Sequence, residues 1–145
     1  MNGPRQLPPA KGQGDGKTGP LQGLRVLDIS TVVAAPTTAA LLADYGATVT
    51  KVELPGVGDS LRQFAPFKDG KSLWWKVTNR DKKMVTLDLR HPEAADLFRR
   101  LLQNADVLVE NFRPGTLDGW GWTRAALRQA QPRLVVLRTT AFGQD

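Results

Sequence analysis

The hydrophobic positions of the chain alternate between short apolar runs and stretches with a helical period. The short runs are typical of buried strands and occupy residues 25–29, 48–53, 84–89, 106–110 and 134–137. Apolar residues with helical spacing follow some of these runs, at residues 36–45, 92–102 and 123–130. This order predicts an α/β fold, with a Rossmann-like parallel sheet, flanking helices and right-handed crossovers.

The segments around these elements indicate the domain boundaries. Residues 1–20 are rich in Gly and Pro without an apolar pattern, which predicts a disordered tail, and residues 21–145 form the α/β domain. Gly16-Lys17-Thr18 resembles the end of a phosphate-binding P-loop, but Lys11 stands where that motif needs a glycine. Residues 54–72 read as a long loop, and residues 73–79 fit either a helix or a strand.

Composition narrows the function classes. The chain has no cysteine and one histidine, which argues against a disulfide scaffold and a metal site. No apolar run approaches the roughly 20 residues of a membrane span, and the amino terminus lacks a secretory signal, so we expect a cytoplasmic protein without membrane contact. The net charge of +6 raises the question of nucleic acid, but the basic residues are dispersed, which favours a small phosphate-bearing ligand or a charge that serves only solubility.

Three predicted loops should meet at one edge of the sheet. Residues 30–35, 54–59 and 111–116 each follow a predicted strand, and the carboxyl edge of a parallel sheet is where open α/β folds bind ligands. Small residues and backbone N–H groups in these loops suit a phosphate-bearing ligand. The alternative is that Gly and Pro only turn the chain there.

Several segments resemble one family. They are LRVLDISTVVAAP, LADYGATVTKVELPGVGD, NRDKKMVTLDLRHPE, ADVLVENFRPGTLDGWG and PRLVVLRTTAFGQD. Together they are similar to the class III CoA-transferases, the family of formyl-CoA:oxalate CoA-transferase, carnitine CoA-transferase and α-methylacyl-CoA racemase. The resemblance runs from Leu21 to the end and implies the amino-terminal part of a class III CoA-transferase subunit, truncated at its carboxyl end.

The resemblance implies a CoA site. The corresponding positions here are Thr31, Val32, Val33, Ala34, Leu54, Leu87, Arg90, Asn111, Phe112 and Arg113. A guanidinium such as that of Arg90 suits phosphates, although a solvated charge is its plain alternative, as core packing is for Phe112. Relatives often have a basic residue at the positions of Thr31 and Leu54. Phosphate binding is therefore expected to fall on Arg62, Lys82, Lys83 or Arg90.

The resemblance also implies the chemistry. Coenzyme A would be a substrate moved from an acyl-CoA to a carboxylic acid through an aspartyl intermediate, with no permanently bound cofactor. The catalytic aspartate is expected beyond the FGQ segment, so no catalytic residue is assigned, and the subunits are expected to form an interlocked homodimer. Two alternatives remain, a non-catalytic CoA- or nucleotide-binding fragment and the racemase branch. Asp28 and Glu110 are expected to be engaged at strand ends.

Overall fold

The computed structural model describes residues 18–144 of the chain. The predicted tail lies outside these residues, apart from residues 18–20. The elements in chain order are β1 (Arg25–Asp28), α1 (Ala34–Asp44), β2 (Thr48–Glu53), the 3₁₀ turn η1 (Ser60–Gln63), β3 (Phe67–Lys68), β4 (Lys71–Ser72), α2 (Leu73–Thr78), β5 (Lys82–Thr86), α3 (Ala94–Gln103), β6 (Val107–Glu110), α4 (Thr116–Gly119), α5 (Arg124–Ala130) and β7 (Val135–Arg138).

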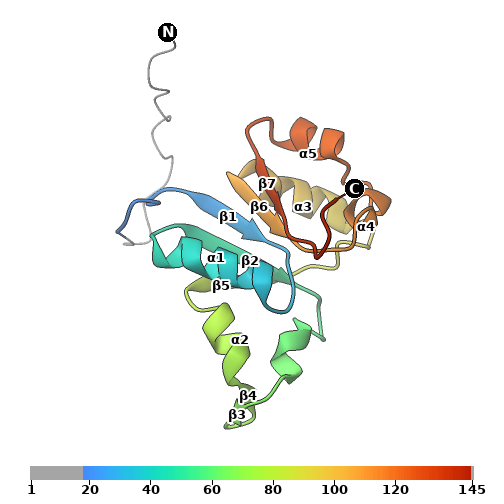
Figure 1. Ribbon diagram of the computed structural model, residues 1–145. Coiled ribbons are helices and arrows are strands. Elements are labelled where there is room, and N and C mark those ends of the chain that lie inside the picture. The colour runs from blue at the N-terminus through green and yellow to red at the C-terminus, as the bar shows by residue number, and fades with distance from the viewer. Residues whose placement is uncertain (1–17, 145) are drawn as a thin grey trace.

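Five strands form one parallel sheet in the order β5-β2-β1-β6-β7 (Figure 1). The chain starts in the middle of the sheet, extends it to one side through β2 and β5, and then returns to the other side through β6 and β7. Numbered along the chain, the order is 3-2-1-4-5, which is the Rossmann order 3-2-1-4-5-6 without its last strand, so the predicted α/β class is confirmed. The order reverses between β1 and β6, and the carboxyl ends of these two strands mark the switch point where such sheets bind ligands.

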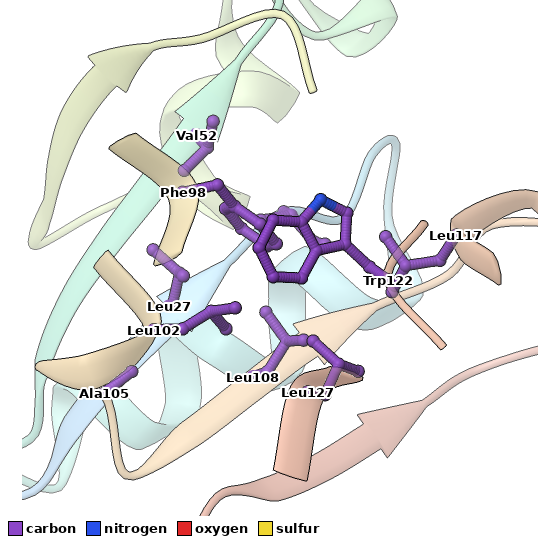
Figure 2. Packing of buried hydrophobic residues seen from close by; sticks show 10 residues of the cluster. Leu27, Val52, Phe98, Leu102, Ala105, Leu108, Leu117, Trp122 and Leu127 are labelled. Atoms are coloured by element: carbon purple, nitrogen blue, oxygen red, sulfur yellow. The ribbon is translucent and has the colours of Figure 1, made fainter. Parts of the chain in front are cut away.

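Helices cover both faces of the sheet. On one face α1 presents Ala35, Ala39 and Ala43 to Val26 and Val49, and these small side chains let the helix lie close to the strands. On the other face α3 and α5 cover a larger cluster that contains Phe98, Leu102, Leu108, Trp122 and Leu127, whose side chains point toward one another in Figure 2. A parallel sheet buried on both faces explains the nearly continuous apolar runs in the sequence.

The helices begin close to, but not at, the predicted residues. α1 begins at Ala34, two residues before Pro36, and α3 begins at Ala94 after a turn at His91-Pro92. Pro36 is tolerated in the first turn because the first four N–H groups of a helix have no intrahelical acceptor. Thr123 caps α5 as predicted and accepts the N–H of Ala126 at 3.2 Å.

Two predictions between β2 and α3 need correction. The strand predicted at residues 84–89 is β5, which runs from Lys82 to Thr86. Leu87 and Leu89 lie beyond it and pack against the larger cluster, the one that α3 and α5 cover. The long loop predicted at residues 54–72 holds η1 and the β3–β4 hairpin. The ambiguous segment that follows is the helix α2, which lies with the hairpin below the sheet in Figure 1. None of the helices in residues 18–144 is long and apolar enough to cross a membrane.

Candidate functional site

The loops after β1, β2 and β6 meet at the carboxyl edge of the sheet. Thr31 donates its N–H to Asn111 Oδ1 and its carbonyl accepts from Asn111 Nδ2, both at 2.8 Å. The next N–H, that of Val32, is donated to Asp59 Oδ1 at 3.0 Å. Side chains of two loops therefore hold the backbone of the third, and the predicted convergence of the three loops is present in the structure.

A cleft of about 310 Å³ opens beside this junction, within the size range of small-molecule sites. It lies along the ends of β1 and β2 and reaches the segment after β5. Its lining residues are Ile29, Ser30, Thr31, Lys51, Val52, Glu53, Leu54, Val57, Gly58, Asp59, Ser60, Leu87, Asp88, Leu89, Arg90, Phe112 and Trp120. Aliphatic and aromatic side chains make up much of the wall, with a few polar groups among them.

The predicted site residues divide between this cleft and its surroundings. Five line it, namely Thr31, Leu54, Leu87, Arg90 and Phe112. Four lie beside it: Val32 and Val33 directly precede α1, Ala34 is the first residue of α1, and Asn111 holds Thr31. Arg113 is exposed and lies with Glu110 and Arg138 at a smaller depression near α4.

Every charged side chain that lines the cleft has an opposite charge beside it. Arg90 donates from Nε and Nη2 to the two oxygens of Asp88, at 2.8 and 2.7 Å. These hydrogen bonds lower the pKa of the Asp88 carboxyl to about 2, so the carboxylate stays charged down to acidic pH. A guanidinium has five N–H donors, so Arg90 keeps donors for a phosphate.

Glu53 forms the centre of a second charge pair at the cleft. Arg62 donates to both of its oxygens, at 2.9 and 3.2 Å, and the guanidinium lies 3.6 Å from the centre of the Trp75 ring. Trp75 Nε1 also donates to Glu53 at 3.3 Å. Arg62 is therefore engaged by Glu53 and Trp75, which argues against it as the main phosphate partner.

Lys82 does not face a ligand. Its side chain has no exposed area, and its ammonium group donates to Asp28, to the Pro36 carbonyl and to Asn79 at 2.7–3.0 Å. Burial lowers the pKa of Lys82, although the carboxylate of Asp28 opposes the shift. Lys82 is thus a structural residue in this fold, and of the four expected phosphate partners Arg90 is the basic residue that lines the cleft.

Four charged side chains form a buried cluster under the cleft. Asp28, Lys51, Asp59 and Lys82 all have fully buried side chains, two acidic and two basic. Asp28 and Lys51 stand at paired positions of β1 and β2, and Asp28 also accepts the N–H of Ser30, as expected of a residue that caps a strand end. The charges balance within the cluster, which is the condition for keeping ions out of water.

The backbone is strained where α1 begins. Val32 has a φ of +68°, a left-handed conformation that a β-branched residue rarely adopts. Such a conformation costs about 1–3 kcal/mol and persists only where the surroundings enforce it. The hydrogen bond from Val32 N to Asp59 and the neighbouring Thr31–Asn111 pair supply that enforcement.

Glu110 holds the segment that forms the Phe112 and Trp120 side of the cleft. Its carboxylate accepts the Phe112 N–H at 2.7 Å and pairs with Arg138 Nε at 3.0 Å, while burial raises its pKa. Phe112 then meets Trp120 edge to face, with ring centroids 5.0 Å apart. Glu110 is thus engaged at a strand end, as expected. Trp120 also lines the cleft, so the two rings form an aromatic part of its wall.

Sequence reasoning missed Lys51, Asp59 and Asp88. A signal for Lys51 exists, because it shares a face of β2 with buried Val49 and stands opposite Asp28 in the neighbouring strand. Asp59 carries a weaker signal, a carboxylate directly before a helical turn. For Asp88 the signal is its place two residues before Arg90.

Chemically, the arrangement suits binding more than bond-making. An apolar wall, a pair of aromatic rings and one guanidinium match a ligand that is partly apolar and partly anionic. Residues 18–144 contain no group of acidic or histidine side chains arranged for a metal ion. The cleft carboxylates Glu53, Asp59 and Asp88 are all held by basic groups.

Comparison with known proteins points to one family. The sequence model of CoA-transferase family III matches residues 21–145. The chain is 51% identical over 126 residues to the succinyl-CoA–L-malate CoA-transferase beta subunit of Chloroflexus aurantiacus, covering 86% of this chain and 31% of that one. It is 40% identical over 124 residues to a formyl-CoA:oxalate CoA-transferase of Rhodopseudomonas palustris, covering 85% of this chain and 29% of that one.

Comparison with solved structures supports the same family. The crystal structure of Rv3272 from Mycobacterium tuberculosis matches with a TM-score of 0.81 and 41% identity, over 90% of this chain and 36% of that one. A CAIB/BAIF family protein from Brucella suis matches with a TM-score of 0.81 and 36% identity, over 88% and 35%. The chain thus spans about a third of the length of the relatives it matches.

Proposed function

The chain belongs to CoA-transferase family III, and from this membership we propose that it forms the CoA-binding part of an enzyme that moves CoA from an acyl-CoA thioester to a carboxylic acid. The observation that carries the proposal is the cleft at the carboxyl edge of the sheet, which opens beside the Thr31–Asn111 pair and is lined by Arg90 and Phe112. The named CoA-transferases among its relatives support the transferase over the racemase branch.

We propose the aspartyl route for the transfer. A carboxylate attacks the acyl-CoA thioester carbonyl and expels CoA thiolate, which leaves a mixed anhydride; the thiolate then attacks the aspartyl carbonyl, releases the donor acid and leaves an aspartyl-CoA thioester. The acceptor carboxylate attacks this thioester and expels CoA thiolate, and the thiolate attacks the acceptor carbonyl of the second anhydride, which gives the new acyl-CoA and frees the aspartate. The cleft carboxylates of this chain are paired with basic groups. The nucleophile is therefore assigned to an aspartate outside the described residues.

The setting of the enzyme is part of the same proposal. Coenzyme A acts as a substrate, with no permanently bound cofactor and no nucleic-acid partner. The subunits form a homodimer, interlocked in the complete protein, in the cytoplasm and without membrane contact. Two of the relatives are named as alpha and beta subunits, which supports assembly from more than one chain.

Binding of CoA tests the cleft. Titration calorimetry of the chain with CoA should give heat, and Arg90→Ala should weaken binding by about 1–3 kcal/mol, the scale of a lost hydrogen bond to a charged group. The loss should shrink as salt is added, because Arg90 is exposed and salt screens its charge.

A matched control is Arg128→Ala. Arg128 is exposed on α5 and is not among the cleft-lining residues, but its replacement removes the same positive charge as Arg90→Ala does. Equal losses in the two variants would mean that CoA responds only to net charge. The absence of heat at high protein concentration would refute the cleft assignment.

The assignment of the nucleophile has its own test. After incubation with a labelled acyl-CoA and a carboxylic acid, hydroxylamine should trap no acyl or CoA adduct on the described residues, because Asp88 is held by Arg90 and the buried Asp59 by Lys51. Mass spectrometry of peptides reads out the adduct, with a full-length relative as positive control. An adduct mapped to one of these carboxylates would place the active-site nucleophile inside the fold described here.

A further inference from the structure

A buried ion pair lies directly behind the loop that leads into α1. Lys51 Nζ is 3.1 Å from Asp59 Oδ2 and donates to the Ser30 carbonyl at 2.6 Å. The other oxygen of Asp59 accepts the N–H of Val32 at 3.0 Å and that of Leu61 at 2.9 Å. The pair therefore holds the residue before Thr31 and the residue after it.

Together with Ser30, Thr31 lines the cleft. Its N–H and carbonyl are both directed at Asn111, which fixes the peptide groups on either side of it. The chain then makes a left-handed turn at Val32, where φ is +68°. A valine does not keep that conformation unaided, so a neighbouring group must hold it.

We propose that Lys51 and Asp59 are positioning residues, which hold Ser30 and Val32 so that Thr31 keeps its place in the wall of the CoA cleft. Their side chains have no exposed area, so they act through the loop. Lys51 places a positive charge 3.1 Å from the buried Asp59 carboxylate, which accepts both N–H groups. The ligand in this inference rests on the proposed function, whereas the hold on the loop does not.

Two double variants separate the acceptor from the charge. Lys51→Met/Asp59→Asn removes both charges but keeps a side-chain oxygen for the Val32 N–H, and Lys51→Met/Asp59→Leu removes the charges and the acceptor. Both leave the remaining buried pair, Asp28 with Lys82, in balance. The measurements are amide hydrogen exchange at Val32 by NMR and calorimetry with CoA as the probe, with amides of the core strand β6 as the reference.

The Asn variant should retain exchange protection at Val32 and lose about threefold in CoA affinity, because it lacks the Lys51 donor to the Ser30 carbonyl but keeps an acceptor for the Val32 N–H. In the Leu variant, exchange protection at Val32 and CoA affinity should each fall roughly tenfold or more, because the Val32 N–H loses its acceptor on Asp59. Protection in β6 should change equally in the two variants. If the Leu variant does not fold, Lys51→Met/Asp59→Ala takes its place as the variant without an acceptor.

Glycine at position 32 adds a rescue that a merely structural role would not predict. Glycine adopts positive φ without strain, so Val32→Gly added to the Leu variant should recover CoA affinity by several-fold. Retained protection at Val32 in the Leu variant would overturn the inference. Lost protection with unchanged CoA affinity would overturn the positioning role. No CoA binding by the unaltered chain would refute the proposed function, and exchange at Val32 would still decide whether Asp59 holds the loop.

Discussion

Phe98→Ala is expected to lower the free energy of unfolding by about 3–5 kcal/mol, the range for removing a large buried aromatic side chain. Phe98 has no exposed area and lies at the centre of the cluster between the sheet and α3. Its ring meets Trp122 edge to face, with centroids 4.8 Å apart, and an aromatic pair of this kind adds to the loss. Equilibrium unfolding in urea, followed by circular dichroism, measures the change.

Leu97→Ala is the matched control on the same helix. The Leu97 side chain is 45% exposed, so its removal should cost less than about 1 kcal/mol. Alanine is also the better helix former, which offsets part of that loss. Similar losses in the two variants would show that α3 is stabilised through its helix and not through the cluster beneath it.

The central strands were predictable because both of their faces are buried. Strands buried on both faces read as apolar runs, and β2 was predicted at its observed residues, 48–53. β5 is an edge strand with exposed Met84 and Val85, so its apolar pattern did not mark its start. Its position is set instead by Lys82, which reaches Asp28 from the strand's first residue.

The β3–β4 hairpin was not predicted, although the sequence contains a typical hairpin-turn dipeptide, Asp69-Gly70. Asp69 and Gly70 both have positive φ, at +51° and +69°, which is the geometry of a two-residue type I′ turn. The strands on either side have only two residues each, too short to show a period. A turn dipeptide therefore carried the information that hydrophobic periodicity did not.

The position of the candidate site could be predicted from the sequence, but the side-chain contacts that hold its loops could not. The loops meet because parallel strands end at the same edge of a sheet, and the sequence indicated a parallel sheet through its alternation of strands and helices. Which side chains hold those loops depends on distances between segments far apart in the chain, such as Asp28 with Lys82 or Thr31 with Asn111. A lysine read from the sequence as a phosphate partner is therefore found buried.

Burial of that lysine leads to the second large effect. Lys82→Met is expected to lower the free energy of unfolding by about 3–5 kcal/mol, because it leaves the buried Asp28 without its closest positive charge. Lys83→Met is the control, since adjacent residues of a strand point to opposite faces and Lys83 is exposed. It should change stability by less than about 0.5 kcal/mol.

The charge account of Lys82→Met is tested by Lys82→Met/Asp28→Asn. This variant removes both charges, keeps an acceptor for the Ser30 N–H, and leaves Lys51 paired with Asp59. It should recover more than half of the lost stability if an uncompensated carboxylate causes the loss. Equal losses in the single and double variants would instead assign the effect to packing and to the hydrogen bond with Pro36.

The pH dependence tests a separate effect, the cost of burying the Lys82 charge, which opposes the attraction of Lys82 to Asp28. Burial lowers the pKa of Lys82 below its ordinary value of 10.5. Between that lowered value and 10.5 the unfolded chain binds more protons at this residue than the folded one, so stability conferred by Lys82 rises with pH in that window and is constant below it. The difference in unfolding free energy between the unaltered chain and Lys82→Met should therefore grow as pH approaches 10.5. A difference that stays flat or falls across the same alkaline range would show that burial does not penalise the ammonium charge.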